Sequence, residues 1–257
     1  MKQYKGYIID LDGTMYRGNE VIDAAIPFIQ TLIENDLSYV FLTNNSTMTL
    51  EQVAHKLTCM GIHATTQNIC TTSMATATYI KSKKPHARCY VIGEEGLRDA
   101  IKKEGLQLVD DENCDFVVVG LDRSITYEKL AIGSLALNRG AEFVSTNSDV
   151  AIPSERGLLP GNGSLTSVLT VATGKKPTFI GKPEEIIVKE ALKLVGTNHK
   201  DTLVIGDNYE TDIKAGLNAG IDTLMVFTGV TPFETYETLA TKPTHYVKSL
   251  KEWIPYI

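Results

Sequence analysis

Short apolar runs rich in valine, isoleucine and tyrosine alternate along the chain with stretches whose apolar residues recur at helical spacing. This alternation is typical of a mostly parallel sheet covered by helices, so it predicts an α/β fold. The predicted strands are residues 4–10, 38–43, 87–92, 115–120, 141–145, 177–180, 202–206, 223–227 and 245–247. The predicted helices are residues 22–35, 49–60, 73–83, 94–104, 127–137, 164–173, 184–195 and 210–219.

Several predicted strands end at a polar or acidic residue. The first ends at Asp10, the second at Thr43, and the seventh directly before Asp207. In open α/β sheets the ligand crevice lies outside the carboxyl ends of the strands, so residues far apart in sequence converge there. One strand-ending aspartate is often only a helix cap or a turn former. The joint occurrence of three polar strand ends predicts a binding site.

The most specific stretch is Asp-Leu-Asp-Gly-Thr at residues 10–14, directly after the first predicted strand. Asp10 and Asp12 are two positions apart in an extended segment, so their side chains project to the same side, and Gly13 allows the chain to turn sharply. Asp10 is the candidate nucleophile and Asp12 the candidate proton donor. Two carboxylates about 4 Å apart repel by roughly 4 kcal/mol at an effective dielectric of 20. A third carboxylate nearby would therefore require a cation, and hard oxygen ligands favour Mg²⁺.

This motif resembles the signature of the haloacid dehalogenase superfamily of phosphatases, and three further motifs of that family follow in order. The second is an apolar strand that ends in Thr43, and the third is Lys182 in the sequence Gly-Lys-Pro. The fourth is a strand-ending acidic pair, matched by Asp207 and Asp212. A single copy of the first motif arises by chance far more often than four motifs in order, each on its predicted element.

The resemblance implies a phosphate-binding role for the second and third motifs. The hydroxyl of Thr43 and the backbone N–H groups of Asn44 and Asn45 would bind phosphate at the entrance to the next helix, where free donors and the helix dipole favour an anion. Lys182 would contact the phosphoryl oxygens and Asp10. A lysine is suited to this because it carries a compact positive charge.

The resemblance also implies a metal site and a reaction. Mg²⁺ would be held by the carboxylates of Asp10 and Asp207 and by the backbone carbonyl of Asp12, with Asp212 as a supporting partner. Asp10 would form an aspartyl phosphate, while Asp12 gives its proton to the leaving oxygen and later takes one from water. The expected activity is a phosphomonoesterase for small esters, namely sugar or acid-sugar phosphates or nucleoside monophosphates.

The spacing of the motifs predicts two domains. One crossover needs only about 30 residues, which is what separates Asp12 from Thr43, whereas residues 44–181 exceed that length by on the order of 100. We expect a discontinuous Rossmann-like core of residues 1–79 and 179–257 with an inserted cap of residues 80–178. The alternation within the insertion resembles the α/β cap of the NagD-like branch of the family, with which a homodimer formed through the caps is compatible.

Charge and composition limit the kinds of binding partner and the cellular compartment that we expect. The 257 residues carry a net charge of −6 with no basic stripe, which argues against binding to nucleic acid or to an anionic membrane surface. No apolar run approaches the roughly 18 residues of a membrane span, and the N-terminus lacks the apolar core of a signal peptide. We therefore expect a cytoplasmic protein. Its four cysteines have no metal-ligand spacing and are expected to be reduced thiols.

Two other functions are the alternatives, and the first of them would use the same four motifs. A phosphomutase would return the phosphate to a substrate instead of giving it to water. A receiver-like module would be phosphorylated on a strand-ending aspartate as a signal, although the long insertion and Asp12 argue against it. Analysis of the products separates a phosphatase from a phosphomutase, and repeated turnover separates either enzyme from a sensor.

Overall fold

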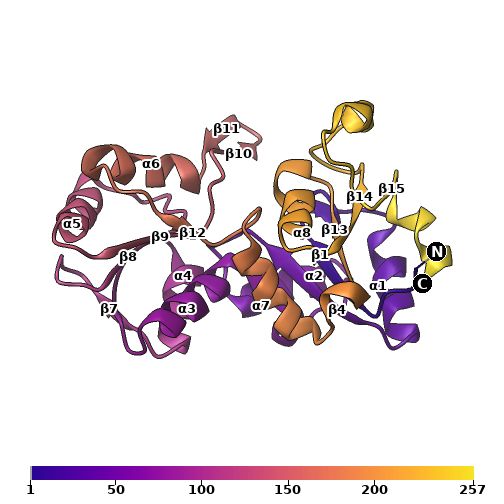
Figure 1. Ribbon diagram of the computed structural model, residues 1–257, viewed down its shortest axis with the longest axis horizontal. Helices are drawn as coiled ribbons and strands as arrows, with labels where there is room; N and C mark the ends of the chain where they lie inside the picture. Colours follow the sequence, from indigo (N-terminus) through magenta and orange to yellow (C-terminus); the bar gives the residue numbers. More distant parts are fainter. Residues whose placement is uncertain (1) are drawn as a thin grey trace. The chain divides into compact units, whose positions relative to one another are not determined.

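The computed structural model describes residues 2–257, and the chain divides into two compact units (Figure 1). The first unit comprises Met1–Thr43, Glu51–Cys70 and Lys182–Ile257, and the second comprises Asn44–Leu50 and Thr71–Gly181. Each unit has its own mostly parallel sheet, which confirms the predicted α/β class. The assignment of a catalytic core and a cap to particular residues stays a prediction.

The first unit is organised around a six-stranded sheet with the order β15-β14-β13-β1-β4-β5. Its strands are β1 (Gly6–Asp10), β4 (Ser38–Thr43), β5 (Ile69–Thr71), β13 (Thr202–Gly206), β14 (Asp222–Val226) and β15 (His245–Val247). Strand β1 pairs in parallel with β13 on one side and with β4 on the other. All of its residues are buried. A strand covered on both faces is expected to read as a continuous apolar run, as this one does.

Helices cover the sheet of the first unit by burying apolar stripes. They are α1 (Ala25–Glu34), α2 (Leu50–Cys59), α7 (Glu185–Val195), the π-helix η3 (Tyr209–Ile213) and α8 (Lys214–Asn218). Helix α1 buries Ala25, Phe28, Ile29 and Leu32, a spacing that places them on one face. Helix α7 ends at Val195 and is capped by Gly196, which adopts the left-handed conformation that is common directly after a helix (φ 73°).

Short elements complete the first unit. They are the hairpin of β2 (Tyr16–Arg17) and β3 (Glu20–Val21), and the 3₁₀ turns η1 (Thr66–Asn68), η2 (His199–Asp201), η4 (Phe233–Thr238), η5 (Leu250–Glu252) and η6 (Ile254–Tyr256).

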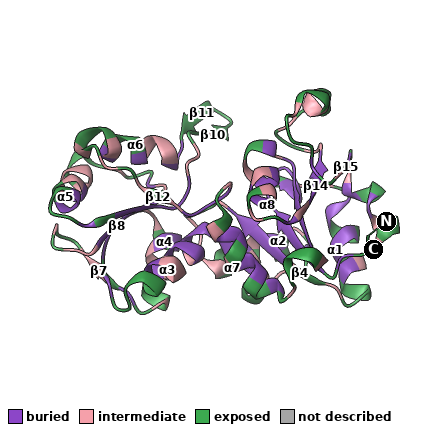
Figure 2. Cartoon of the chain, in the orientation of Figure 1, coloured by how far each residue is buried: buried purple, intermediate pink, exposed green. Residues whose placement is uncertain are grey.

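The second unit has a five-stranded sheet with the order β12-β9-β8-β6-β7, in which all pairs are parallel. Its strands are β6 (Arg88–Ile92), β7 (Gln107–Val109), β8 (Phe116–Val119), β9 (Glu142–Ser145) and β12 (Thr178–Phe179). Its helices are α3 (Thr72–Lys83), α4 (Glu95–Lys103), α5 (Tyr127–Asn138) and α6 (Asn162–Thr173). The hairpin of β10 (Ala151–Ser154) and β11 (Gly157–Pro160) is largely exposed, whereas β8 is buried (Figure 2).

Every predicted strand and helix has a counterpart, with bounds that differ by a few residues. Strands β2, β3, β5, β7, β10 and β11 were not predicted, because segments of two to four residues carry too little periodicity and exist through their pairing partners. The predicted helix at residues 210–219 is a π-helix followed by the short helix α8.

Two further expectations concern the cysteines and the membrane. Cys59, Cys70, Cys89 and Cys114 are all free. No helix within residues 2–257 has the length and apolar character needed to cross a bilayer.

The contact between α1 and β1 allows the packing of the hydrophobic core of the first unit to be tested. Phe28 is fully buried and meets the ring of Tyr7 edge to face, with 6.1 Å between the ring centres. Phe28→Ala should lower the free energy of unfolding by about 3–5 kcal/mol, because it removes a buried ring and leaves a cavity. Ile26→Ala, at a position 39% exposed on the same helix, is the control and should cost far less. Equal midpoints of denaturant unfolding for the two variants would contradict this packing.

Candidate active site

The carboxyl ends of the central strands bring the predicted residues together. Asp10 is the last residue of β1, Thr43 is the last residue of β4, and Asp207 directly follows β13. Because β13, β1 and β4 are neighbouring parallel strands, these ends lie at the same edge of the sheet. Lys182 precedes helix α7 in the sequence and Asp212 lies in the π-helix η3.

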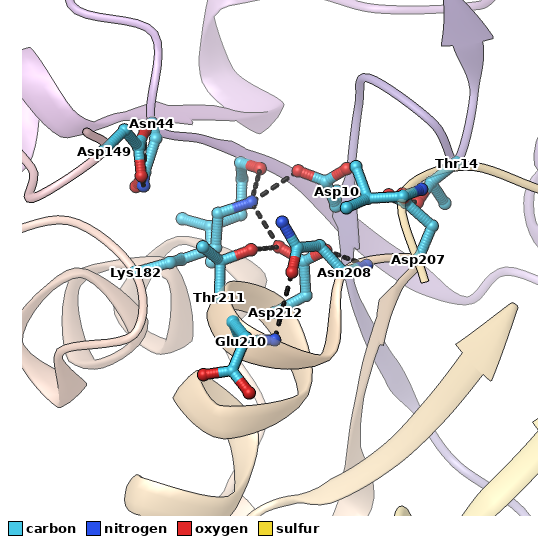
Figure 3. A network of polar contacts seen from close by, with 12 residues as sticks. Asp10, Thr14, Asn44, Asp149, Lys182, Asp207, Asn208, Glu210, Thr211 and Asp212 are labelled. Atoms are coloured by element: carbon cyan, nitrogen blue, oxygen red, sulfur yellow. Dashed lines mark hydrogen bonds and ion pairs between the residues drawn. The ribbon is translucent and has the colours of Figure 1, made fainter. Parts of the chain in front are cut away.

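A buried lysine connects two of the carboxylates. Lys182 Nζ is ion-paired with Asp10 Oδ1 and lies 2.6 Å from Asp212 Oδ1 (Figure 3). It also donates a hydrogen bond to the carbonyl of Leu42 at 3.3 Å. Lys182 and Asp212 are only 3% and 2% exposed, respectively. Charge-assisted contacts of this kind fix the position of each partner, so Lys182 sets where the Asp10 carboxylate lies.

Three carboxylates converge around this lysine. Oxygen atoms of Asp10, Asp207 and Asp212 all lie within 4.8 Å of one another. One ammonium cannot balance three carboxylates at such distances, so the cluster favours a further cation. The donors are all hard oxygens, which is the chemistry that Mg²⁺ prefers, and the cluster therefore fits this ion.

The two oxygens of Asp212 are already engaged. Oδ1 accepts from Lys182 and from the Thr211 hydroxyl, and Oδ2 accepts from the backbone N–H of Asn208 at 3.1 Å. Asp212 is thus a partner that positions Lys182. Asp12 does not join the carboxylate cluster, since its side chain is exposed. The metal contact predicted for Asp12 is through its backbone carbonyl and stays a prediction, as do the catalytic roles of both residues.

Burial and neighbouring charge shift the ionisation of this cluster. Burial raises the pKa of Asp10 well above its usual value, and the negative charge of Asp212 adds to this, while Lys182 opposes it. Burial and Asp212 together raise the pKa of Asp207 to about 6. Burial alone would lower the pKa of Lys182, but the charges of Asp10 and Asp212 raise it. Lys182 therefore remains an ammonium across the physiological range.

The predicted phosphate-binding residues fall in two places. Thr43 is buried at the end of β4 in the first unit. Asn44 and Asn45 belong to the second unit, where Asn44 Nδ2 lies 3.3 Å from both carboxylate oxygens of Asp149. Asn45 Oδ1 accepts from the backbone N–H groups of residues 47 and 48 at 3.0 Å, directly before helix α2. Their contacts with phosphate stay a prediction.

A loop that the sequence analysis missed holds Asp207 in place. It comprises residues 228–231, directly beyond β14. The backbone N–H of Val230 donates to Asp207 Oδ2 at 2.6 Å, and the Thr228 hydroxyl donates to the carbonyl of Gly13 at 2.6 Å. A Cβ atom on Gly229 would overlap Asp207 Oδ2 and would lie 2.7 Å from Gly13 Cα. The signal was present, since Thr228 and Gly229 follow a predicted strand as the other polar strand ends do.

Gly13 is required for a related reason. Its φ of 91° is in the region that favours glycine, and a Cβ there would overlap the Asp207 carboxylate. On the other side of Asp207, the Thr14 hydroxyl donates to Oδ1 at 3.2 Å. The first motif and the 228–231 loop thus close around the same carboxylate.

Comparison with known proteins agrees with this geometry. The haloacid dehalogenase-like hydrolase model matches residues 7–107, and a HAD-hydrolase-like model matches residues 179–253. The 5′-nucleotidase YutF of Bacillus subtilis is 60% identical over 257 residues, with full coverage of both chains. The chain belongs to the haloacid dehalogenase-like hydrolase family. This confirms the resemblance inferred from the four motifs.

Other members of the family are similar over nearly the whole chain. The acid sugar phosphatase of Staphylococcus saprophyticus is 50% identical over 254 residues, which cover 99% of this chain and 98% of the relative. The solved structure of p-nitrophenyl phosphatase from Archaeoglobus fulgidus superposes with a TM-score of 0.95 at 33% identity, and the match covers all of both chains. The proteins that this chain resembles are thus named for different phosphate esters.

Because the 228–231 loop holds Asp207 in place, we expect a substitution in this loop to weaken Mg²⁺ binding. Gly229→Ala should raise the dissociation constant for Mg²⁺ at least about tenfold, since the added methyl group must displace Asp207 Oδ2 and such overpacking costs about 1–3 kcal/mol. Calorimetric titration of Mg²⁺ measures it. Gly133→Ala is the matched control, because a Cβ there meets its neighbours at an ordinary 3.4 Å or more. Wild-type Mg²⁺ affinity in a folded Gly229→Ala protein would refute the role of this loop.

The raised pKa of Asp207 predicts how Mg²⁺ binding depends on pH. The metal-free protein keeps a proton on this carboxyl up to about pH 6, and a metal must displace it. Affinity for Mg²⁺ should therefore fall as the pH drops below about 6, by about tenfold per pH unit for one displaced proton. Calorimetry at pH 5 and pH 7.5 tests this, and equal affinities at the two values would show that Asp207 is ionised throughout.

Proposed function

We propose that this chain is a Mg²⁺-dependent phosphomonoesterase that acts on small phosphate esters through an aspartyl-phosphate intermediate. The observation that carries the proposal is the convergence of Asp10, Lys182 and Asp207 at the carboxyl edge of the first sheet. The phosphatase names of its relatives support the same conclusion. Acid-sugar phosphates and nucleoside monophosphates are the ester classes that those names suggest.

In the first half of the proposed reaction, an Asp10 carboxylate oxygen attacks phosphorus and the bond from phosphorus to the leaving oxygen breaks. Asp12 gives its proton to that oxygen, so the alcohol leaves neutral. Asp12 suits this role because it is exposed, whereas Asp10 is 8% exposed and held by Lys182. Lys182 keeps the nucleophile in place and offers positive charge to the phosphoryl oxygens.

In the second half, Asp12 takes a proton from water and the resulting hydroxide attacks phosphorus. The bond between phosphorus and Asp10 breaks, which restores the carboxylate and releases inorganic phosphate. Asp10 and Asp207 would hold Mg²⁺, with the backbone carbonyl of Asp12. When bound, the ion neutralises charge that develops on the phosphoryl oxygens.

The inserted segment completes the proposal. In the proposed function, residues 80–178 are a cap that selects among leaving groups, while residues 1–79 and 179–257 carry the chemistry. The separate sheet of the second unit supports its having a role of its own.

Asp10→Asn tests the nucleophile. Turnover should fall below about one thousandth of the wild-type rate, because an amide cannot attack phosphorus. The near-isosteric change leaves Lys182 paired with Asp212, so the protein should stay folded by circular dichroism. Release of phosphate and alcohol from p-nitrophenyl phosphate is the assay, and equal yields of both distinguish hydrolysis from transfer to a second substrate.

The control for this variant is Asp110→Asn, at a side chain that is 95% exposed. It should retain the wild-type rate. A folded Asp10→Asn protein with wild-type turnover would remove Asp10 as the nucleophile.

A further inference from the structure

A cation that the proposed mechanism does not use lies in the same unit as the candidate active site. Lys56 is in the last turn of α2, with its Nζ 4.0 Å from the centre of the Tyr16 ring. Among residues 2–257, no carboxylate forms an ion pair with this ammonium. Half-burial lowers the pKa of Lys56, and the negative charge of Asp12 opposes that shift. The ammonium is therefore within electrostatic reach of Asp12 yet is not neutralised by a bound partner.

Tyr16 fixes this ammonium beside the first motif. Its backbone forms a bridge with Asp12, and its carbonyl accepts from the N–H of Gly13 at 2.7 Å. The side chain is only 7% exposed. Burial raises the pKa of the phenol, and the negative charges of Asp10 and Asp12 raise it further.

A contact with an aromatic ring leaves the charge of a lysine available. The ring attracts the ammonium through its quadrupole and restricts its motion, but it supplies no negative charge to cancel it. Within the part of the chain that the structure describes, the Tyr16 hydroxyl also makes no hydrogen bond to the protein. An ammonium and a hydroxyl are thus both free to bind a ligand near Asp12.

The proposed mechanism places the leaving group on this side. Asp12 gives its proton to the leaving oxygen, so the alcohol part of the ester must lie next to Asp12. The chain carries a net charge of −6, which repels an anionic substrate in general. A local cation would then decide whether an alcohol that carries its own negative charge is accepted.

We propose that Lys56, held in place by Tyr16, binds a carboxylate on the leaving group and so makes the enzyme favour phosphate esters of hydroxy acids. This inference rests on the proposed function, because it assumes that Asp12 faces the leaving oxygen. It assigns Lys56 a role in specificity that is separate from attack on phosphorus.

The experiment compares two esters that differ at one group. Glycerol 3-phosphate carries a hydroxymethyl group where 3-phosphoglycerate carries a carboxylate. The value of kcat/KM is measured for both with the full-length protein and saturating Mg²⁺. In Lys56→Gln, the preference for the carboxylate ester over the neutral one should fall about tenfold, mainly through KM. Lys56→Arg keeps the charge and should retain most of the preference.

Lys248→Gln is the matched control. The ammonium of Lys248 also lies over an aromatic ring, at 4.9 Å from the centre of Phe233. Its replacement removes the same charge and the same kind of contact elsewhere in the first unit. The ratio of the two kcat/KM values should stay at the wild-type value.

Two results would overturn the inference. An unchanged ratio in Lys56→Gln would mean that Lys56 serves only the packing of Tyr16. An equal loss for both esters would mean that it acts on Asp12 and not on the substrate. Failure of the proposed function is recognised separately, since the wild-type protein would then release phosphate from neither ester.

Discussion

The candidate active site depends on keeping one lysine charged where water cannot reach it. Lys182 is 3% exposed, and an ammonium buried without partners would lose several kcal/mol of hydration. The carboxylates of Asp10 and Asp212 and the carbonyl of Leu42 replace that hydration. The same contacts fix the Asp10 carboxylate at the edge of the sheet. In the proposed mechanism, the ion pairs that keep Lys182 charged therefore also hold the nucleophile in place.

The ion pairs of Lys182 leave part of the negative charge of the carboxylate cluster uncompensated. Three carboxylates around one ammonium leave negative charge in a buried place, and this excess favours a divalent cation. Burial raises the pKa of Asp207, and the negative charge of Asp212 raises it further. The protein holds Asp207 with Thr14 on one oxygen and with the backbone N–H of Val230 on the other. In the proposed metal site, such donors would orient Asp207 without adding positive charge that competes with the metal.

In the proposed function, the chemistry and the choice of substrate depend on different residues. Asp10, Lys182, Asp207 and Asp212 all belong to the first unit, and in the proposed reaction they surround the phosphorus that is attacked. Relatives with high identity over nearly the whole chain carry the names of a 5′-nucleotidase and an acid sugar phosphatase. A common catalytic site with variable contacts to the alcohol accounts for such a family. Lys56 offers one such contact from within the first unit.

The sequence was sufficient for the fold class, for the main elements and for the three carboxylates and the lysine that converge in the candidate site. The long strands and helices are visible because burial along one segment leaves its own periodicity, as in α1, where Ala25, Phe28, Ile29 and Leu32 face the core. Asp10 and Asp207 could be selected because each ends or follows such a strand. The carboxyl ends of parallel strands must meet, whatever the intervening chain does.

Only the tertiary structure revealed the contacts that depend on how separate segments pack. The position of Gly229 in the sequence does not indicate a contact with Asp207. Its lack of a side chain matters only because the 228–231 loop lies against that carboxylate. Lys56 likewise reads as an ordinary lysine of a surface helix until Tyr16 is found beneath it. The physical reason is that the spacing of apolar residues along a segment indicates only which face of that segment is buried. It does not record which distant residue lies against that face, and that pairing is decided by the packing of the whole unit.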